Sequence, residues 1–129
     1  MGLDAKAGIH LGRASGSLFQ ASDVSVLPYT LVLQSGVMFL SYSFGLPVIA
    51  SDVGSSKEDI LGGDMGFVCR PSDAHELAAA IEKYFESDLF RPLDRRRPQI
   101  QDFSKQRNSW RAVSGKTRQV YARLLEAER

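Results

Sequence analysis

Two short polar segments carry the residues of this chain that are best suited to chemistry. The first, Gln34-Ser35-Gly36, precedes an apolar run over residues 37–44. Ser and Gly are common where a helix begins, and the first helical turn offers unpaired N–H groups and a positive dipole end, which suit a phosphate. We therefore predict that Ser35, Gly36 and Val37 bind a phosphate, and that Gln34 either reaches a hydroxyl of the ligand or caps the helix. The plainer alternative is that Ser35 and Gly36 only begin the helix.

The second polar segment, Asp52-Val53-Gly54-Ser55, follows a short apolar run over residues 47–50. A helix N-terminus and the loop after a buried strand meet at the carboxyl edge of an open α/β sheet, where such sheets bind ligands. We therefore expect Asp52, Gly54 and Ser55 to border a pocket at this edge. The alternative for Gly54 is a turn without a ligand.

The elements that would position these segments alternate along the chain. Apolar runs predict strands at residues 8–11, 24–27, 48–50 and 66–69, and helical patterns occupy residues 16–22, 35–44, 57–61 and 73–86. Gly45 suits the end of the second helix, and Asp73 with Glu76 predicts a capping box for the fourth. This alternation predicts a Rossmann-like α/β fold, a parallel sheet with flanking helices.

The C-terminal third follows another pattern. Pro92, Pro98 and the run at residues 95–97 predict a loop or broken helix over residues 91–101, with the three arginines solvated rather than bound to RNA or lipid. Ser109 then caps a long C-terminal helix. Its apolar stripe consists of Trp110, Val113, Thr117, Val120, Tyr121, Leu124 and Leu125. We expect Trp110 to lie in a core or an interface.

Composition limits the classes of function. The 129 residues suffice for one domain, and 43% hydrophobic with 24% charged residues is ordinary for a globular protein. The formal net charge of +1 gives no strong attraction to nucleic acid. The single cysteine, Cys69, excludes an internal disulfide, and its apolar surroundings predict a buried, inert thiol. We expect no metal site, no secretory signal, and no membrane span, since no apolar run approaches about 20 residues.

Five segments resemble motifs of the family four retaining glycosyltransferases, which have the two-domain GT-B architecture, in the order that the family has them. The segments read ASDVSVLPY, QSGVMFLSYSFGLPVIASDVG, GSSKE, GFVCRPSD and SWRAVSGKTRQVY. The resemblance implies that residues 1–129 form a single, partial C-terminal domain, the half that binds the sugar donor. It also implies that Glu58 matches a loop glutamate of the family and belongs to the binding site. We expect the Glu58 carboxylate to accept hydrogen bonds from nearby backbone N–H groups, with direct contact to the sugar as the alternative.

The chain departs from the family's pattern in two ways. The family's two glutamates, separated by seven residues around the helix at residues 35–44, fall here on Val32 and Leu40, so the resemblance implies no glutamate contact with the donor ribose. The family's Arg and Lys for the donor diphosphate precede the segments matched here, as does the acceptor-binding domain. We therefore expect an incomplete GT-B C-terminal domain.

The resemblance implies a retaining, metal-independent transfer of sugar from a nucleotide-diphosphate sugar, with no cofactor besides this donor. No residue of this chain is assigned a catalytic role, and we expect the chain alone to be inactive, with its N-terminal partner domain encoded in the same gene or a neighbouring one. One alternative is a non-catalytic binding or assembly module. Another is a flavodoxin-like nucleotide domain, for which the loop at residues 12–16 would be the phosphate loop.

Assembly and location are inferred from the same resemblance. The family's last helix packs on the partner domain, so the apolar stripe would lack its cover here, and the absence of the family's first strands would leave an open sheet edge. We expect a homodimer through the last helix and the edge near Ile9. We expect a cytoplasmic location, with peripheral attachment of the full enzyme to the inner membrane as the open alternative.

Overall fold

The computed structural model describes residues 16–61 and 64–127 of this chain. Residues 16–21 are helical. The elements that follow are β1 (Ser25–Leu27), α2 (Gly36–Ser43), β2 (Val48–Ser51), α3 (Ser56–Leu61), β3 (Gly66–Cys69), α4 (Ala74–Glu86), α5 (Leu93–Asn108) and α6 (Trp110–Ala127). Three predicted features lie outside the described residues: the strand at residues 8–11, the sheet edge near Ile9 and, apart from Gly16, the loop at residues 12–16.

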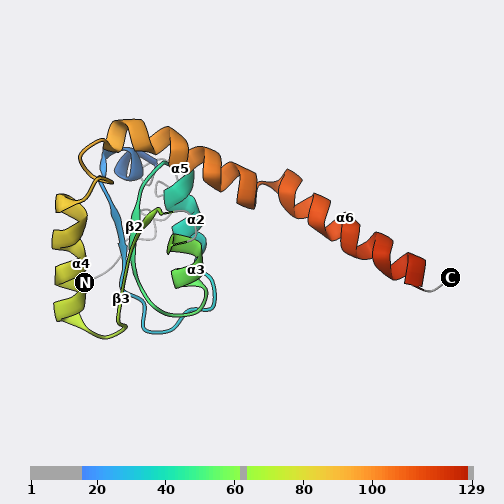
Figure 1. Cartoon of the computed structure of the whole chain (residues 1–129), viewed down its shortest axis with the longest axis horizontal. Coiled ribbons are helices and arrows are strands. Elements are labelled where there is room, and N and C mark those ends of the chain that lie inside the picture. The colour runs from blue at the N-terminus through green and yellow to red at the C-terminus, as the bar shows by residue number, and fades with distance from the viewer. Residues whose placement is uncertain (1–15, 62–63, 128–129) are drawn as a thin grey trace, which may run out of the picture.

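The three strands form a parallel sheet in the order β1-β2-β3. In Figure 1 the sheet stands between α4 on one face and α2 with α3 on the other. Each strand returns to the next through a helix, as a parallel sheet requires. The predicted Rossmann-like α/β fold is confirmed, and β3 has the predicted bounds.

Two apolar clusters hold the layers together. The first fills the space between the sheet and α2, α3 and α5, and it includes Leu27, Met38, Tyr42, Val48, Ala50, Ile60, Met65 and Ile100. The second lies under α4 and includes Ile49, Cys69, Ala80, Tyr84 and Leu89. All four residues of β2 are buried, because this central strand has helices on both faces.

Local sequence signals set the ends of α2. The hydroxyl of Ser35 accepts a hydrogen bond from the backbone N–H of Met38 at 3.2 Å, which makes Ser35 the N-cap. Gly45 ends the helix with φ of 73°, where an added Cβ would clash with Arg97 of α5. The predicted helix start and stop are therefore confirmed.

The cap of α4 differs in part from the prediction. Asp73 accepts the N–H of Glu76 at 3.0 Å, as expected. The Glu76 carboxylate does not return this bond but accepts from the N–H of Arg70 at 2.7 Å and from its guanidinium. The prediction that Glu76 completes the capping box is therefore wrong, because the guanidinium and the backbone N–H of Arg70 are better donors for its carboxylate.

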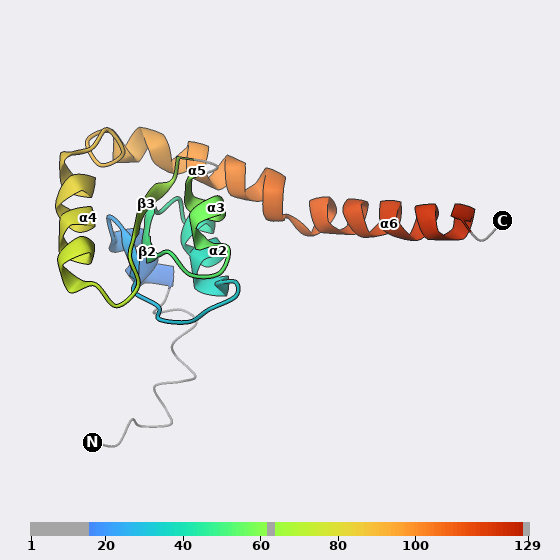
Figure 2. The same ribbon diagram turned by 60° about the horizontal axis from the view of Figure 1, so that its bottom comes forward.

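The expected loop over residues 91–101 is wrong, because most of this segment belongs to α5. The helix continues through Pro98 for 16 residues. It lies across α2, as Figure 2 shows, and buries Leu93, Ile100 and Ser104 against the body of the domain. Tertiary packing thus outweighs the helix-breaking tendency of a single proline.

The expectation that all three arginines at residues 95–97 are solvated is also wrong. Arg97 donates hydrogen bonds to the carbonyl of Ser22 at 2.5 Å and that of Phe44 at 3.4 Å. Phe44 is the C-cap of α2, so the Arg97 guanidinium donates to a carbonyl that the end of the helix leaves without a partner. Arg96 lies 3.7 Å from Asp64, whereas Arg95 is exposed.

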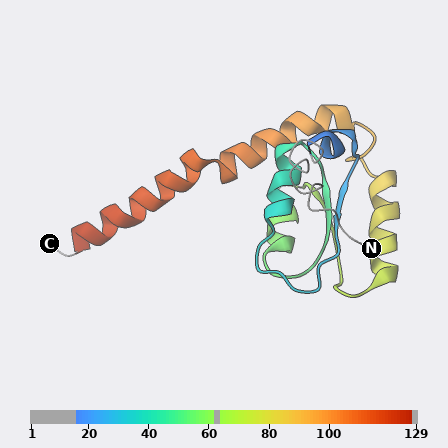
Figure 3. The same cartoon turned by 180° about the vertical axis from the view of Figure 1, so that it is seen from behind.

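The last helix, α6, projects from the domain, as Figure 1 and Figure 3 show from opposite sides. Ser109 caps it by accepting the N–H of Ala112 at 3.1 Å, as predicted. None of its described residues is buried, and Trp110 is 89% exposed, so a place for Trp110 in the core of the described chain is ruled out. Among the described helices, none combines the length and the apolar character that crossing a bilayer requires.

Candidate functional site

The start of α2 presents free amide groups at the carboxyl edge of the sheet. The Ser35 hydroxyl serves Met38 and is buried, so it is committed to the helix. The backbone N–H groups of Gly36 and Val37 have no hydrogen-bond acceptor among the described residues. Gly36 is exposed, and nothing stands within 4 Å of where its Cβ would be. Two solvent-facing amides at the positive end of a helix can therefore receive an anion.

The loop after β2 meets the segment that leads into α2. The N–H of Ser55 donates to the carbonyl of Leu33 at 3.2 Å. Gly54 has φ of 56°, and an added Cβ would clash with the carbonyls of Val32 and Leu33. The turn therefore requires glycine, both for its backbone angle and for this close approach. The two predicted segments, far apart in sequence, are brought together, as the loops at the lower edge of Figure 1 show.

The other predicted binding residues are at this edge but differ in their surroundings. Gln34 is exposed and has no hydrogen bond within the described part of the chain. Asp52 is exposed and lies 4.0 Å from Lys57, a cation that our sequence reasoning did not single out. The expected bonds of Glu58 to backbone N–H groups are not formed with any described residue, because its side chain points to solvent. The neighbouring carboxylate, that of Asp59 in α3, makes the structural contacts instead.

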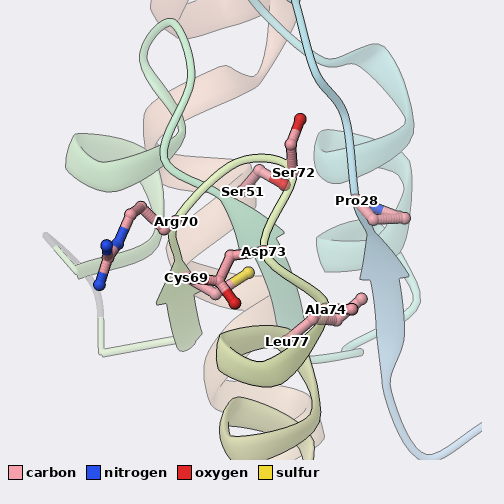
Figure 4. A pocket seen from close by; sticks show the side chains of 8 residues that line it. All are labelled: Pro28, Ser51, Cys69, Arg70, Ser72, Asp73, Ala74 and Leu77. Carbon is pink, nitrogen blue, oxygen red and sulfur yellow. The ribbon is translucent and has the colours of Figure 1, made fainter.

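A cavity of about 310 Å³ lies on the other side of the sheet edge, at the start of α4. Figure 4 shows the residues that line it: Pro28, Ser51, Cys69, Arg70, Ser72, Asp73, Ala74 and Leu77. Sequence reasoning did not place a cavity here, although the turn residues Ser72 and Asp73 after β3 are the signal that a strand end opens at this point.

The start of α4 is poorly suited to a phosphate. The carboxylate of Asp73 already occupies the helix N-terminus, and that of Glu76 binds Arg70. The backbone N–H of Arg70, followed by its guanidinium, lowers the pKa of Glu76, so this group is anionic near neutral pH. Because two carboxylates stand at this end, the start of α2 is better suited to an anion than that of α4.

Cys69 and His75 take no part in a reactive site within the described chain. Burial raises the pKa of the Cys69 thiol, which confirms the expected buried thiol and keeps it protonated at neutral pH. His75 is exposed on α4. Groups of three or more His, Cys, Asp or Glu side chains that could share a metal ion do not occur among the described residues.

Comparison with known proteins identifies the family. A family model described as "Glycosyl transferases group 1" matches residues 9–87, which include β1, α2, β2 and both segments of the candidate site. The chain belongs to this family of glycosyltransferases. The predicted family is therefore confirmed, and the match covers four of the five sequence segments; the fifth, at residues 109–121, lies beyond it.

Individual relatives of this glycosyltransferase chain agree with the assignment. It is 28% identical to glycogen synthase of Mycobacterium tuberculosis over 116 residues, which are 88% of this chain and 27% of that protein. The structure matches sucrose-phosphate synthase from Thermosynechococcus elongatus with a TM-score of 0.66 and 28% identity, over 85% of this chain and 27% of that one. The chain thus spans about a quarter of the length of these relatives.

Proposed function

We propose that this chain is the donor-binding part of a glycosyltransferase that moves a sugar from a nucleotide-diphosphate sugar to an acceptor. The N–H groups of Gly36 and Val37 receive the diphosphate. The loop that contains Asp52, Gly54 and Ser55 borders the sugar, and the exposed side chains of Gln34 and Glu58 are free to reach hydroxyls of the ligand.

The observation that supports this proposal most is the contact between the two loops. We call residues 52–55 the sugar-side loop. The hydrogen bond from Ser55 to Leu33 and the close approach of Gly54 hold this loop against the segment that leads into α2 and its free amides. This geometry lets one ligand touch both segments. Family membership adds that sugar transfer is the chemistry of proteins built on this domain.

The chemical role of the amides is electrostatic. When a sugar leaves a nucleotide diphosphate, negative charge grows on the departing phosphate, and fixed N–H donors stabilise that charge without rearranging. We assign no catalytic residue in this chain. Because joining donor and acceptor supplies about 7–11 kcal/mol in favourable cases, the chain alone should show no measurable transfer without an acceptor domain.

A thermal-shift panel tests the proposal. Uridine, adenosine and guanosine diphosphate sugars at up to 20 mM should include at least one that raises the melting temperature, with a Kd of about 1 mM, equal to about 4 kcal/mol. Gly36→Asp should abolish this shift, because the new carboxylate faces the phosphate. Gly115→Asp is the matched control, since it makes the same change in open space on α6. No shift with any donor, or a shift that survives Gly36→Asp, would refute the proposal.

We also infer a second, assembly role from one observation on α6. Its apolar residues Trp110, Val120, Tyr121, Leu124 and Leu125 are 56–89% exposed and form one stripe. Such a stripe usually marks an interface, and a symmetric dimer covers it with a second copy. Light scattering should then give ~28 kDa, twice the 14.2 kDa chain. A monomer at 500 μM with α6 intact would exclude the dimer.

A further inference from the structure

Asp59 is a buried carboxylate that connects separate elements beside the candidate site. It lies in α3, and only 11% of its side chain is exposed. One oxygen, Oδ2, accepts the hydroxyl of Ser55 at 2.7 Å, and the other, Oδ1, lies 3.4 Å from Nη2 of Arg107 near the end of α5. Both oxygens are therefore engaged, as a buried carboxylate requires.

The Ser55 hydroxyl has a choice of acceptors, and Asp59 decides it. The hydroxyl oxygen lies 2.7 Å from the Asp59 carboxylate but 3.4 Å from the carbonyl of Leu33. Since a hydroxyl has one proton, it donates to the closer, charged acceptor. The carbonyl of Leu33 is left to the backbone N–H of Ser55, at 3.2 Å. The side chain of Ser55 therefore bonds to α3, while its backbone N–H bonds to the segment before α2, and both bonds fix the turn.

Arg107 and Tyr42 complete the surroundings of Asp59. Arg107 is half-exposed, so its ion pair orients the carboxylate more than it stabilises the fold. Tyr42 belongs to α2, and its buried hydroxyl has no hydrogen-bond partner among the described residues. Burial, followed by the negative charge of Asp59, raises the pKa of Tyr42, so this hydroxyl remains neutral. The carboxylate therefore contacts Ser55 and Arg107, and its charge acts on Tyr42 of α2.

We propose that Asp59 is a positioning residue of the donor site: held by Arg107, it fixes the Ser55 turn against Leu33 and so sets the sugar-side loop relative to the free amides of α2. This inference rests on the proposed function. Asp59 does not touch the donor, and it acts only through Ser55. It follows that α5, far along the sequence, contributes to the geometry of the site through Arg107.

The test measures donor affinity and turn geometry separately in the full chain. Asp59→Asn should weaken binding of the best nucleotide-diphosphate sugar about fivefold, the scale of one hydrogen bond. Ser55→Ala should have the same effect, and the double variant should lose no more than either single one, because both act through one bond. Hydrogen exchange of the Ser55 amide should speed up in Asp59→Asn, and Arg107→Lys should retain more affinity than Arg107→Gln. Asp102→Asn, an exposed acid on α5, is the matched control.

The outcomes separate this inference from the proposed function. If the unaltered chain binds a donor and Asp59→Asn binds it equally well, the positioning role is wrong and the proposed function stands. Affinity losses that add in the double variant, or loss of stability with unchanged affinity and unchanged Ser55 exchange, would also overturn it. If the unaltered chain binds no donor at all, the proposed function fails and the positioning role fails with it.

Discussion

Gly54→Ala should loosen the contact on which the candidate site depends. Alanine at a φ of 56° costs about 1–2 kcal/mol. Its Cβ would also overlap the carbonyls of Val32 and Leu33, which forces the loops apart and breaks the Ser55–Leu33 bond, for about 1 kcal/mol more. The sum of about 2–3 kcal/mol should lower the melting temperature by about 10 °C in a domain of this size.

Circular dichroism in the far ultraviolet is the suitable probe for this variant. The single tryptophan, Trp110, is 89% exposed on α6 and would report little of the unfolding of the domain. Gly36→Ala is the matched control: its Cβ meets nothing within 4 Å, so the melting temperature should stay the same or rise by a few degrees. A Gly54→Ala variant that melts together with the unaltered chain would refute the close contact between the two loops.

Three further predictions concern the rest of the domain. Tyr84→Phe should lower stability by about 1 kcal/mol at pH 7, because the hydroxyl donates to the carbonyl of Asp23 at 2.6 Å. Burial raises the pKa of Tyr84 to about 12, so urea midpoints of the unaltered chain should be flat near neutrality and fall above about pH 10, less steeply in Tyr84→Phe. Arg97→Gln should lower the free energy of unfolding by about 1–3 kcal/mol, because two carbonyls lose their donor, whereas Arg95→Gln should change it hardly at all. Equal urea midpoints for the two variants would contradict the role of Arg97 at the end of α2. At concentrations where light scattering shows a monomer, amides of α6 should exchange with solvent far faster than those of β2, because no described residue of α6 is buried against the domain. Equal protection in the monomer would show that α6 has a cover within its own chain.

The fold was predictable where the signals are local. Ser35, Gly45, Asp73 and Ser109 act on neighbours within a turn, and they set helix ends as expected. The helix α5 was not predictable, because the contacts that stabilise it cross long sequence distances. Arg97 binds carbonyls 53 and 75 residues away, and no local pattern reveals them.

The same division holds for the candidate site. Parallel strands place their carboxyl ends at one edge, so the meeting of the loop after β2 with the segment that leads into α2 could be expected from the sequence. The roles of Glu58 and Asp59 could not. Both are acidic and adjacent in sequence, and only the approach of Ser55 and Arg107 shows that Asp59 is the buried, bonded one.

An amide chemical-shift titration with nucleotide-diphosphate sugars tests the central claim most directly. The largest shifts should fall on Gly36 and Val37, with a second group at Gly54 and Ser55, and they should saturate with one Kd of about 1 mM. Both groups should disappear together in Gly36→Asp. Shifts confined to the cavity at the start of α4, around Cys69 and Asp73, or shifts of the two groups with different affinities, would contradict a single donor site at the start of α2.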